Sequence, residues 1–139
     1  MHLWIELGAA ALFVPVAALI HGLGLAIMSK LLNVSDEALE KRTLDPSSFY
    51  LIGVLGLALF MVHATVVAAY AGFYAAVGAA RSAEDALFFS ISSYTTAGAG
   101  VDRIPDAWKL VGGSEALVGL LLVGWSTAYL VRKIEKLRH

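Results

Sequence analysis

Three long apolar stretches, at residues 3–32, 48–80 and 110–131, constrain this chain more than any other feature of its sequence. A helix needs about 20 apolar residues to cross the roughly 30 Å hydrocarbon core of a bilayer, and each stretch is long enough. Hydrophobic residues make up 59% of the chain and charged residues 15%, which does not fit a water-soluble monomer. The sequence therefore predicts an all-α membrane protein with three transmembrane helices.

The first stretch is predicted to be a retained helix rather than a cleaved signal peptide. Its beginning, MHLWIE, contains no Lys or Arg, and its apolar run exceeds the roughly 7–15 residues of a signal peptide. Pro15 is tolerable inside it because neighbouring helices can satisfy the carbonyl that a proline frees. We expect this helix to pack outside the second one, as an addition that faces lipid or a partner.

The distribution of positive charge predicts how the helices cross. Three Lys and Arg residues lie in or next to the link between the first two helices, and four lie near the C-terminus. The segment 81–109, on the other side, contains three. By the positive-inside rule the N-terminus and the segment 81–109 face outward, while the link and the tail are cytoplasmic. This topology indicates a multi-pass protein of the inner (plasma) membrane. The charged link at 35–42 is predicted to form a short surface helix.

The segment between the second and third stretches is the most informative. Ser82 and Asp85 have the spacing of a helix capping box, and an apolar run of only about ten residues follows at 86–95. Ten residues cannot cross a bilayer, and the run ends in the sequence TTAGAG. We therefore predict a re-entrant element, a short helix that enters the membrane and an extended chain that leaves it. Non-helical backbone at that depth must be buried in protein or line a water-filled path.

The sequence of this element, ALFFSISSYTTAGAG at 86–100, resembles the pore helix and selectivity filter of the potassium-channel superfamily, whose filter usually ends in TVGYG. Residues 115–128 are similar to the inner helix of the small bacterial two-helix channels of that superfamily. The resemblance implies a pore domain at 48–133, made of an outer helix, a pore helix, a filter and an inner helix. An additional helix at 1–32 and a cytoplasmic linker at 33–47 precede it, and a short tail at 134–139 follows it.

The residues also indicate the chemistry of such a filter. Stripping water from a cation requires carbonyl oxygens aimed at one axis, which a strand achieves when alternate residues adopt the backbone angles that Gly98 and Gly100 permit. Stacked rings of carbonyls would then hold K⁺ or another monovalent cation. One chain supplies a quarter of each ring, so the resemblance implies a homotetramer. The carbonyls are those of Thr96, Ala97, Gly98 and Ala99, within a filter formed by Thr95, Thr96, Ala97, Gly98, Ala99 and Gly100.

The filter departs from the family pattern in ways that leave its selectivity open. Ala99 replaces the usual Tyr, Ala97 replaces Val, and Val101 displaces the acid after the filter to Asp102. Small side chains leave volume behind the strand, and a poorly packed backbone relaxes. A potassium-preferring pore, a weakly selective pore and a non-conducting pore are the three alternatives.

The third helix carries the predicted gating residues. Gly119 and Gly124 are candidate hinges, although a glycine can instead let a neighbouring helix come close. The stripe of Gly119, Val123, Thr127 and Val131 has the spacing of one helix face, and we expect it to line a cavity with a hydrophobic gate near Val131.

Charged residues near the outer end of the third helix are predicted to support the filter or its mouth. Glu115 is costly in a membrane unless it is paired or wetted, and Arg103 is the partner we expect. The alternative is a carboxylate that reaches water at the interface. Asp102 and Asp106 flank the predicted outer mouth, where they would concentrate cations or simply be solvated.

Two histidines, His21 and His63, are the ionisable side chains well inside the first and second helices. They can ligate a haem iron, although no further motif supports this, or they can form hydrogen bonds between helices. A proton-sensing role for His63 is a further alternative. Ser126, in the third helix, is expected to return its hydroxyl to a backbone carbonyl.

Several classes of protein do not fit the sequence. A net charge of −1 provides no basic footprint for nucleic acid, and a chain without cysteine has no thiolate chemistry. No catalytic or phosphate-binding motif is present, so we expect neither enzyme activity nor an organic cofactor.

The sequence thus predicts a homotetrameric cation channel of potassium-channel type in contact with membrane lipids. Its short tail leaves gating to the membrane part or to an unidentified regulatory partner. The alternatives are a non-conducting membrane protein that keeps the channel fold and, less favoured, a haem protein with two histidine ligands.

Overall fold

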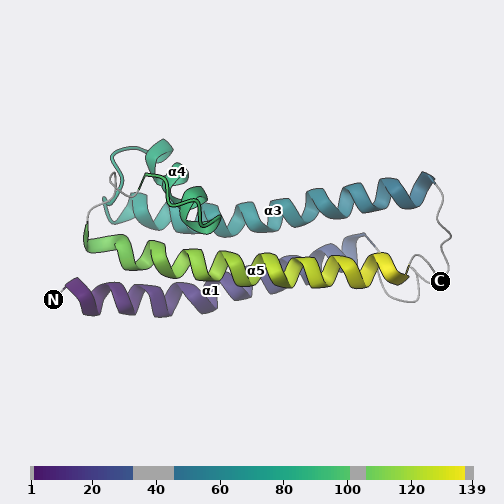
Figure 1. Ribbon diagram of the computed structural model, residues 1–139, viewed down its shortest axis with the longest axis horizontal. Coiled ribbons are helices and arrows are strands. Elements are labelled where there is room, and N and C mark those ends of the chain that lie inside the picture. Colours follow the sequence, from purple (N-terminus) through teal and green to yellow (C-terminus); the bar gives the residue numbers. More distant parts are fainter. Residues whose placement is uncertain (1, 33–45, 101–105, 137–139) are drawn as a thin grey trace.

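The computed structural model describes residues 2–32, 46–100 and 106–136, and within these residues all regular structure is helical. Three long helices run along the molecule (Figure 1): α1 (His2–Leu31), α3 (Pro46–Ala76) and α5 (Lys109–Lys136). A short helix, α4 (Ala83–Tyr94), and a 3₁₀ turn, η2 (Asp106–Trp108), lie between α3 and α5 in the sequence. The long helices contain stretches of 29, 28 and 27 residues that are apolar enough to cross a membrane. The predicted fold class is confirmed.

The chain reverses direction sharply between α3 and α4. Gly78 has a φ of +66°, and the amide of Ala79 donates to the Tyr74 carbonyl at 2.9 Å, which closes the C-terminus of α3. Ser82 then caps α4, because its hydroxyl accepts the amide of Asp85 at 3.0 Å, as the capping box predicts. As a result α4 runs back along the end of α3, which Figure 1 shows at the same end of the molecule as the N-terminus.

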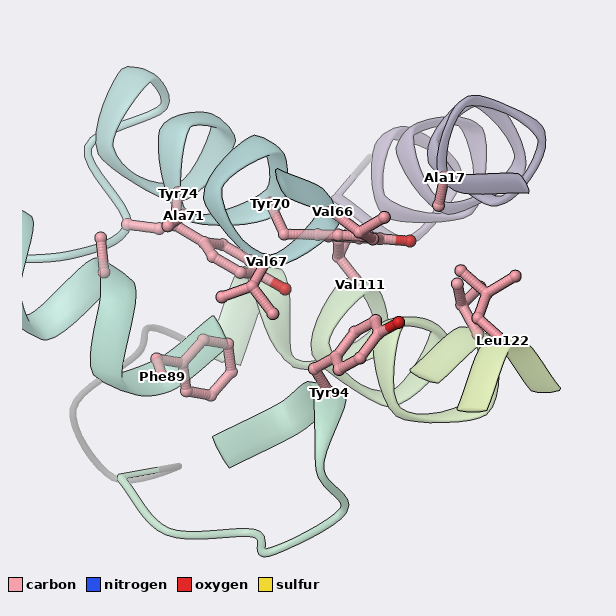
Figure 2. Packing of buried hydrophobic residues seen from close by; sticks show 13 residues of the cluster. Ala17, Val66, Val67, Tyr70, Ala71, Tyr74, Phe89, Tyr94, Val111 and Leu122 are labelled. Carbon is pink, nitrogen blue, oxygen red and sulfur yellow. The ribbon is translucent and has the colours of Figure 1, made fainter. Parts of the chain in front are cut away.

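The core of this end lies between α3, α4 and α5. Figure 2 shows the rings of Tyr70, Tyr74, Phe89 and Tyr94 gathered there, and each of these residues is buried. Edge-to-face contact between Tyr74 and Phe89, with ring centroids 5.0 Å apart, joins α3 to α4. This packing holds the short helix in place although it is too short to cross a bilayer.

Small residues on α5 let α4 come close. A Cβ atom added at Gly119 would lie 2.0 Å from the carbonyl oxygen of Tyr94, and one at Gly112 would lie 2.8 Å from the ring of Phe89. The last residue of α4 therefore rests directly on the backbone of α5. This is the close approach that the sequence left open for Gly119.

The expectation that the first helix packs outside the second is wrong in one respect, because α1 packs against α5 as well as α3. Polar side chains explain this position, since a polar group in a bilayer needs a partner from another helix. Three residues of α1 reach α5 at three depths: Glu6 accepts the Leu110 amide (3.2 Å), His21 contacts Ser126 (2.8 Å) and Ser29 contacts Tyr129 (2.7 Å).

Other parts of the predicted organisation lie outside the described residues. These are the surface helix at 35–42 and most of the linker at 33–47, of which only residues 46 and 47 are described. Residue 46 is Pro46, the first residue of α3, as expected for a proline at the start of a helix.

Candidate functional site

The segment that follows α4 has an alternating backbone. The angle φ is +60° at Thr96, +68° at Gly98 and +78° at Gly100, whereas Ala97 and Ala99 are not among the residues with positive φ. Gly98 and Gly100 thus adopt the left-handed angles that the sequence analysis assigned to them. The same conformation at Thr96 was not foreseen, because threonine is β-branched and rarely enters this region.

The hydrogen bonds around Thr96 explain its conformation. The amide of Ala97 donates to the Ser92 carbonyl and that of Thr96 to the Ser93 carbonyl, each at 2.9 Å. These two bonds form a Schellman cap at the C-terminus of α4, with Thr96 in the position where glycine is usual. A non-glycine residue held there costs about 1–3 kcal/mol. The cap therefore fixes the point at which the short helix becomes the predicted filter.

The predicted filter is exposed on the single chain, and a pocket lies beside it. Residues 95–99 are all exposed on the single chain. An open pocket of about 270 Å³ lies between the filter and the start of α5, and its lining includes Phe89, Gly98, Gly112 and Ala116. Neither Ala97 nor Ala99 is among its lining residues, so the expectation that these two small side chains leave volume behind the strand stays a prediction.

Glu115 joins α3, α4 and α5. Its side chain is fully buried, and its carboxyl group lies 2.8 Å from the Tyr74 hydroxyl and 2.5 Å from that of Ser90. The Ser90 hydroxyl also lies 2.9 Å from the Val67 carbonyl oxygen. One acid on α5 therefore contacts both α3 and α4. Sequence reasoning selected Glu115 but missed Tyr74 and Ser90, because nothing in their spacing along the chain brings them together.

Two of the predicted supports of the filter cannot be placed. Arg103, the expected partner of Glu115, and Asp102, at the predicted mouth, both lie outside the described residues. Their roles stay predictions.

The predicted gating residues on α5 have two different surroundings. Gly119 is buried against Tyr94, whereas Gly124 is exposed and a Cβ there would meet nothing within 4 Å. Val123, Thr127 and Val131 are all exposed on the single chain. These three residues are free to face a pore axis or another subunit, whereas Gly119, the first residue of the predicted stripe, is covered by the end of α4. The hinge and gate remain predictions.

The two histidines meet at the serine of α5. His21 Nε2 lies 2.8 Å and His63 Nε2 lies 2.9 Å from the Ser126 hydroxyl oxygen, and His63 Nδ1 lies 2.6 Å from the Tyr94 hydroxyl. The expectation that Ser126 returns its hydroxyl to a backbone carbonyl is thus wrong, since two imidazoles hold it instead. The hydrogen-bonded alternative for the histidines is the one observed.

Comparison with known proteins gives one result for the functional class. A protein-family model described as "Ion channel" matches residues 55–136, more than half of the chain and the whole of α4, the predicted filter and α5. No curated protein and no solved structure matches the chain. The matched region begins within α3, so α1 lies outside it, as the resemblance described above implies.

Proposed function

The chain belongs to this ion-channel family, and we propose that it forms a homotetrameric channel that conducts K⁺ passively across the inner (plasma) membrane. Four copies of residues 95–100 surround the axis in this proposal. The carbonyl oxygens of Thr96, Ala97, Gly98 and Ala99 replace the hydration shell of the ion. The N-terminus lies outside and the C-terminal tail lies in the cytoplasm, as the positive-inside rule requires.

One observation carries the proposal, namely the alternation of left-handed angles at Thr96, Gly98 and Gly100. In an ordinary strand successive carbonyls point to opposite sides, so a strand cannot present a row of oxygens to one axis. A positive φ at every second residue permits such a row. The location of this segment supports the same reading, because it follows a short capped helix and its residues are exposed on the single chain.

Ion flux into liposomes tests the proposal. Purified protein in K⁺-loaded vesicles is expected to take up a tracer cation in a K⁺-dependent manner that Ba²⁺ blocks. The variant Gly98→Ala should abolish uptake, because a side chain is strained at φ +68°. Gly8→Ala, on α1, is the matched control, since a Cβ at that helical glycine also meets nothing within 4 Å.

The result that contradicts the proposal is equally direct. Vesicles that stay sealed to K⁺ and Na⁺ with well-folded protein, at each pH and voltage applied, would favour the alternative of a non-conducting membrane protein that keeps the channel fold.

A further inference from the structure

A chain of hydrogen bonds links one residue from each of the four helices. His21 of α1 and His63 of α3 share the hydroxyl of Ser126 on α5, and His63 also contacts the hydroxyl of Tyr94 on α4. We call these four residues the latch. The two imidazole rings lie 5.2 Å apart between centroids, and His21 is fully buried.

The number of protons in the latch is limited. Its three links need one proton each, while two neutral imidazoles and two hydroxyls bring four. The fourth proton lies on His21 Nδ1, on the outer side of the Tyr94 hydroxyl, or on Ser126 when its oxygen accepts from both imidazoles. In the last case the Ser126 proton has no acceptor beyond the imidazoles among the described residues. His21 Nδ1 is buried without a hydrogen-bond partner among the described residues, so the favourable arrangement leaves this nitrogen unprotonated.

A fifth proton cannot be accommodated in the same way. With one imidazole positively charged, two protons lie outside the three links, so either His21 Nδ1 or the Ser126 hydroxyl becomes a buried donor with no acceptor among the described residues. An unpartnered buried donor is costly, and a positive charge inside the membrane adds to the cost. The closed latch therefore binds a proton more weakly than an open latch whose imidazoles reach water, and acid shifts the equilibrium toward the open form.

No other described ionisable group hydrogen-bonds to either imidazole. Facing His63 are His21 from α1 and Tyr94 from α4, while α5 contributes Ser126, which does not titrate in this range. Glu115, further along α5, hydrogen-bonds Tyr74 and Ser90 instead. A response to mild acid is therefore expected from the two histidines, since histidine is the side chain that titrates between about pH 5 and 8.

The latch lies where it can control movement of α5. Ser126 follows the candidate hinge Gly124 closely, and the Ser29–Tyr129 contact lies one helical turn further toward the inner end. These contacts hold the inner half of α5 against α1. At the other end of the latch, Tyr94 is the last residue of α4 before the predicted filter.

We propose that the latch is a proton-binding site through which acid releases the inner half of α5 from α1 and increases conduction. The effect on conduction rests on the function proposed above. The ligand is the proton itself, and α1 acts as the regulatory element of the channel rather than as a passive addition.

The first experiment measures flux against pH. We expect K⁺ flux through wild-type protein to rise about tenfold from about pH 8 to about pH 5.5. A change of this size corresponds to the free-energy cost of leaving one buried donor without an acceptor. His63→Gln should lose this dependence, and Ser126→Ala should raise flux at about pH 8, because it disconnects the histidines. His2→Gln, at the start of α1, is the matched control and should respond as the wild type does. Flux that is independent of pH in the wild type, or an unchanged response in His63→Gln, would overturn the proposal.

The second experiment does not depend on conduction. Because the chain has no cysteine, spin labels can be placed at Leu31→Cys on α1 and Glu135→Cys on α5, two exposed residues near the inner end. Labelled protein is assembled with excess unlabelled chain, so that distances within one subunit dominate. Acid should lengthen or broaden this distance with native His63 and leave it unchanged with His63→Gln. A constant distance would refute the latch, whereas a shift in protein that conducts no ions would refute the proposed function and retain the latch.

Discussion

The space around Gly119 leaves room for no side chain. The Tyr94 carbonyl oxygen occupies the position of a Cβ atom, so the backbone of α5 and the end of α4 are in direct contact. Gly124 lies on the same helix and has open space around it. The sequence could not separate these two cases, because both glycines lie in the same apolar run and only the position of α4 distinguishes them.

We expect Gly119→Ala to destabilise the protein by more than about 2 kcal/mol, the usual scale of overpacking in a close contact. Gly124→Ala should be neutral or should stabilise α5 by up to about 1 kcal/mol, because alanine is the better helix former. Thermal unfolding of both variants in the same detergent measures the difference. Equal stability of the two would mean that α4 does not rest on Gly119.

Ala99 is the residue at which the predicted filter departs most from the family pattern. The ring of a tyrosine there would fill space behind the strand and limit the relaxation that a small side chain allows. Ala99→Tyr is therefore expected to raise the permeability ratio of K⁺ over Na⁺ severalfold, measured from reversal potentials in planar bilayers. Ala99→Ser is the small-residue control and should keep the wild-type ratio. An unaltered ratio in well-folded Ala99→Tyr protein would count against residues 95–100 as the filter.

The elements of the fold were predictable to different degrees. The number of long helices, the short helix and its Ser82 cap follow from local properties, namely the length of an apolar run and the spacing of a capping box. The lateral packing was not predictable, because helices that are apolar on every side do not reveal which face contacts protein. The position of α1 depends on Glu6, His21 and Ser29, whose partners lie about a hundred residues away in the sequence.

The docking of α4 is the element whose stability can be tested most directly. Glu115→Leu leaves the buried hydroxyls of Tyr74 and Ser90 without their carboxyl partner, and we expect a loss of about 2–4 kcal/mol in unfolding free energy. Glu115→Gln keeps a hydrogen-bonding group of the same size and should lose less than half as much. Denaturant titration in a fixed micelle measures both. The exposed Glu135→Leu is the control and should be close to wild type.

The comparison between the two Glu115 variants decides which interaction matters. If Glu115→Gln were as unstable as Glu115→Leu, a negative charge at this position, rather than its hydrogen bonds, would hold α4 against the other helices. This outcome would contradict the role assigned to the hydrogen bonds of Glu115 with Tyr74 and Ser90.

For the molecule as a whole, the proposed function makes the single chain incomplete as a pore. The chain contributes one predicted filter segment, of which residues 95–99 are exposed, and the large apolar side chains Leu117, Leu120 and Leu121 on α5 are mostly exposed as well. A cyclic assembly covers such surfaces and closes a ring of carbonyls at the same time. The proposed function therefore requires a definite number of chains. Flux measured on mixtures of wild-type and variant chains can determine that number.

Mixing subunits performs this count. If one Gly98→Ala chain inactivates a ring of four, equal amounts of wild-type and variant chain leave only about one sixteenth of the complexes fully wild type, because four independent choices must all fall on wild type. Flux in liposomes should fall to about one sixteenth of the wild-type value, whereas an assembly of two chains would keep about one quarter of it. An equal mixture with Gly8→Ala, whose added Cβ meets open space on α1, should conduct as wild type and shows that mixing itself is harmless. Native mass measurement of the mixed sample, in multiples of the 14.7 kDa chain, establishes that the variant assembles at random with wild type. Flux that falls only in proportion to the wild-type fraction would mean that each chain acts alone, and the shared axis on which the proposed ion pathway depends would not exist.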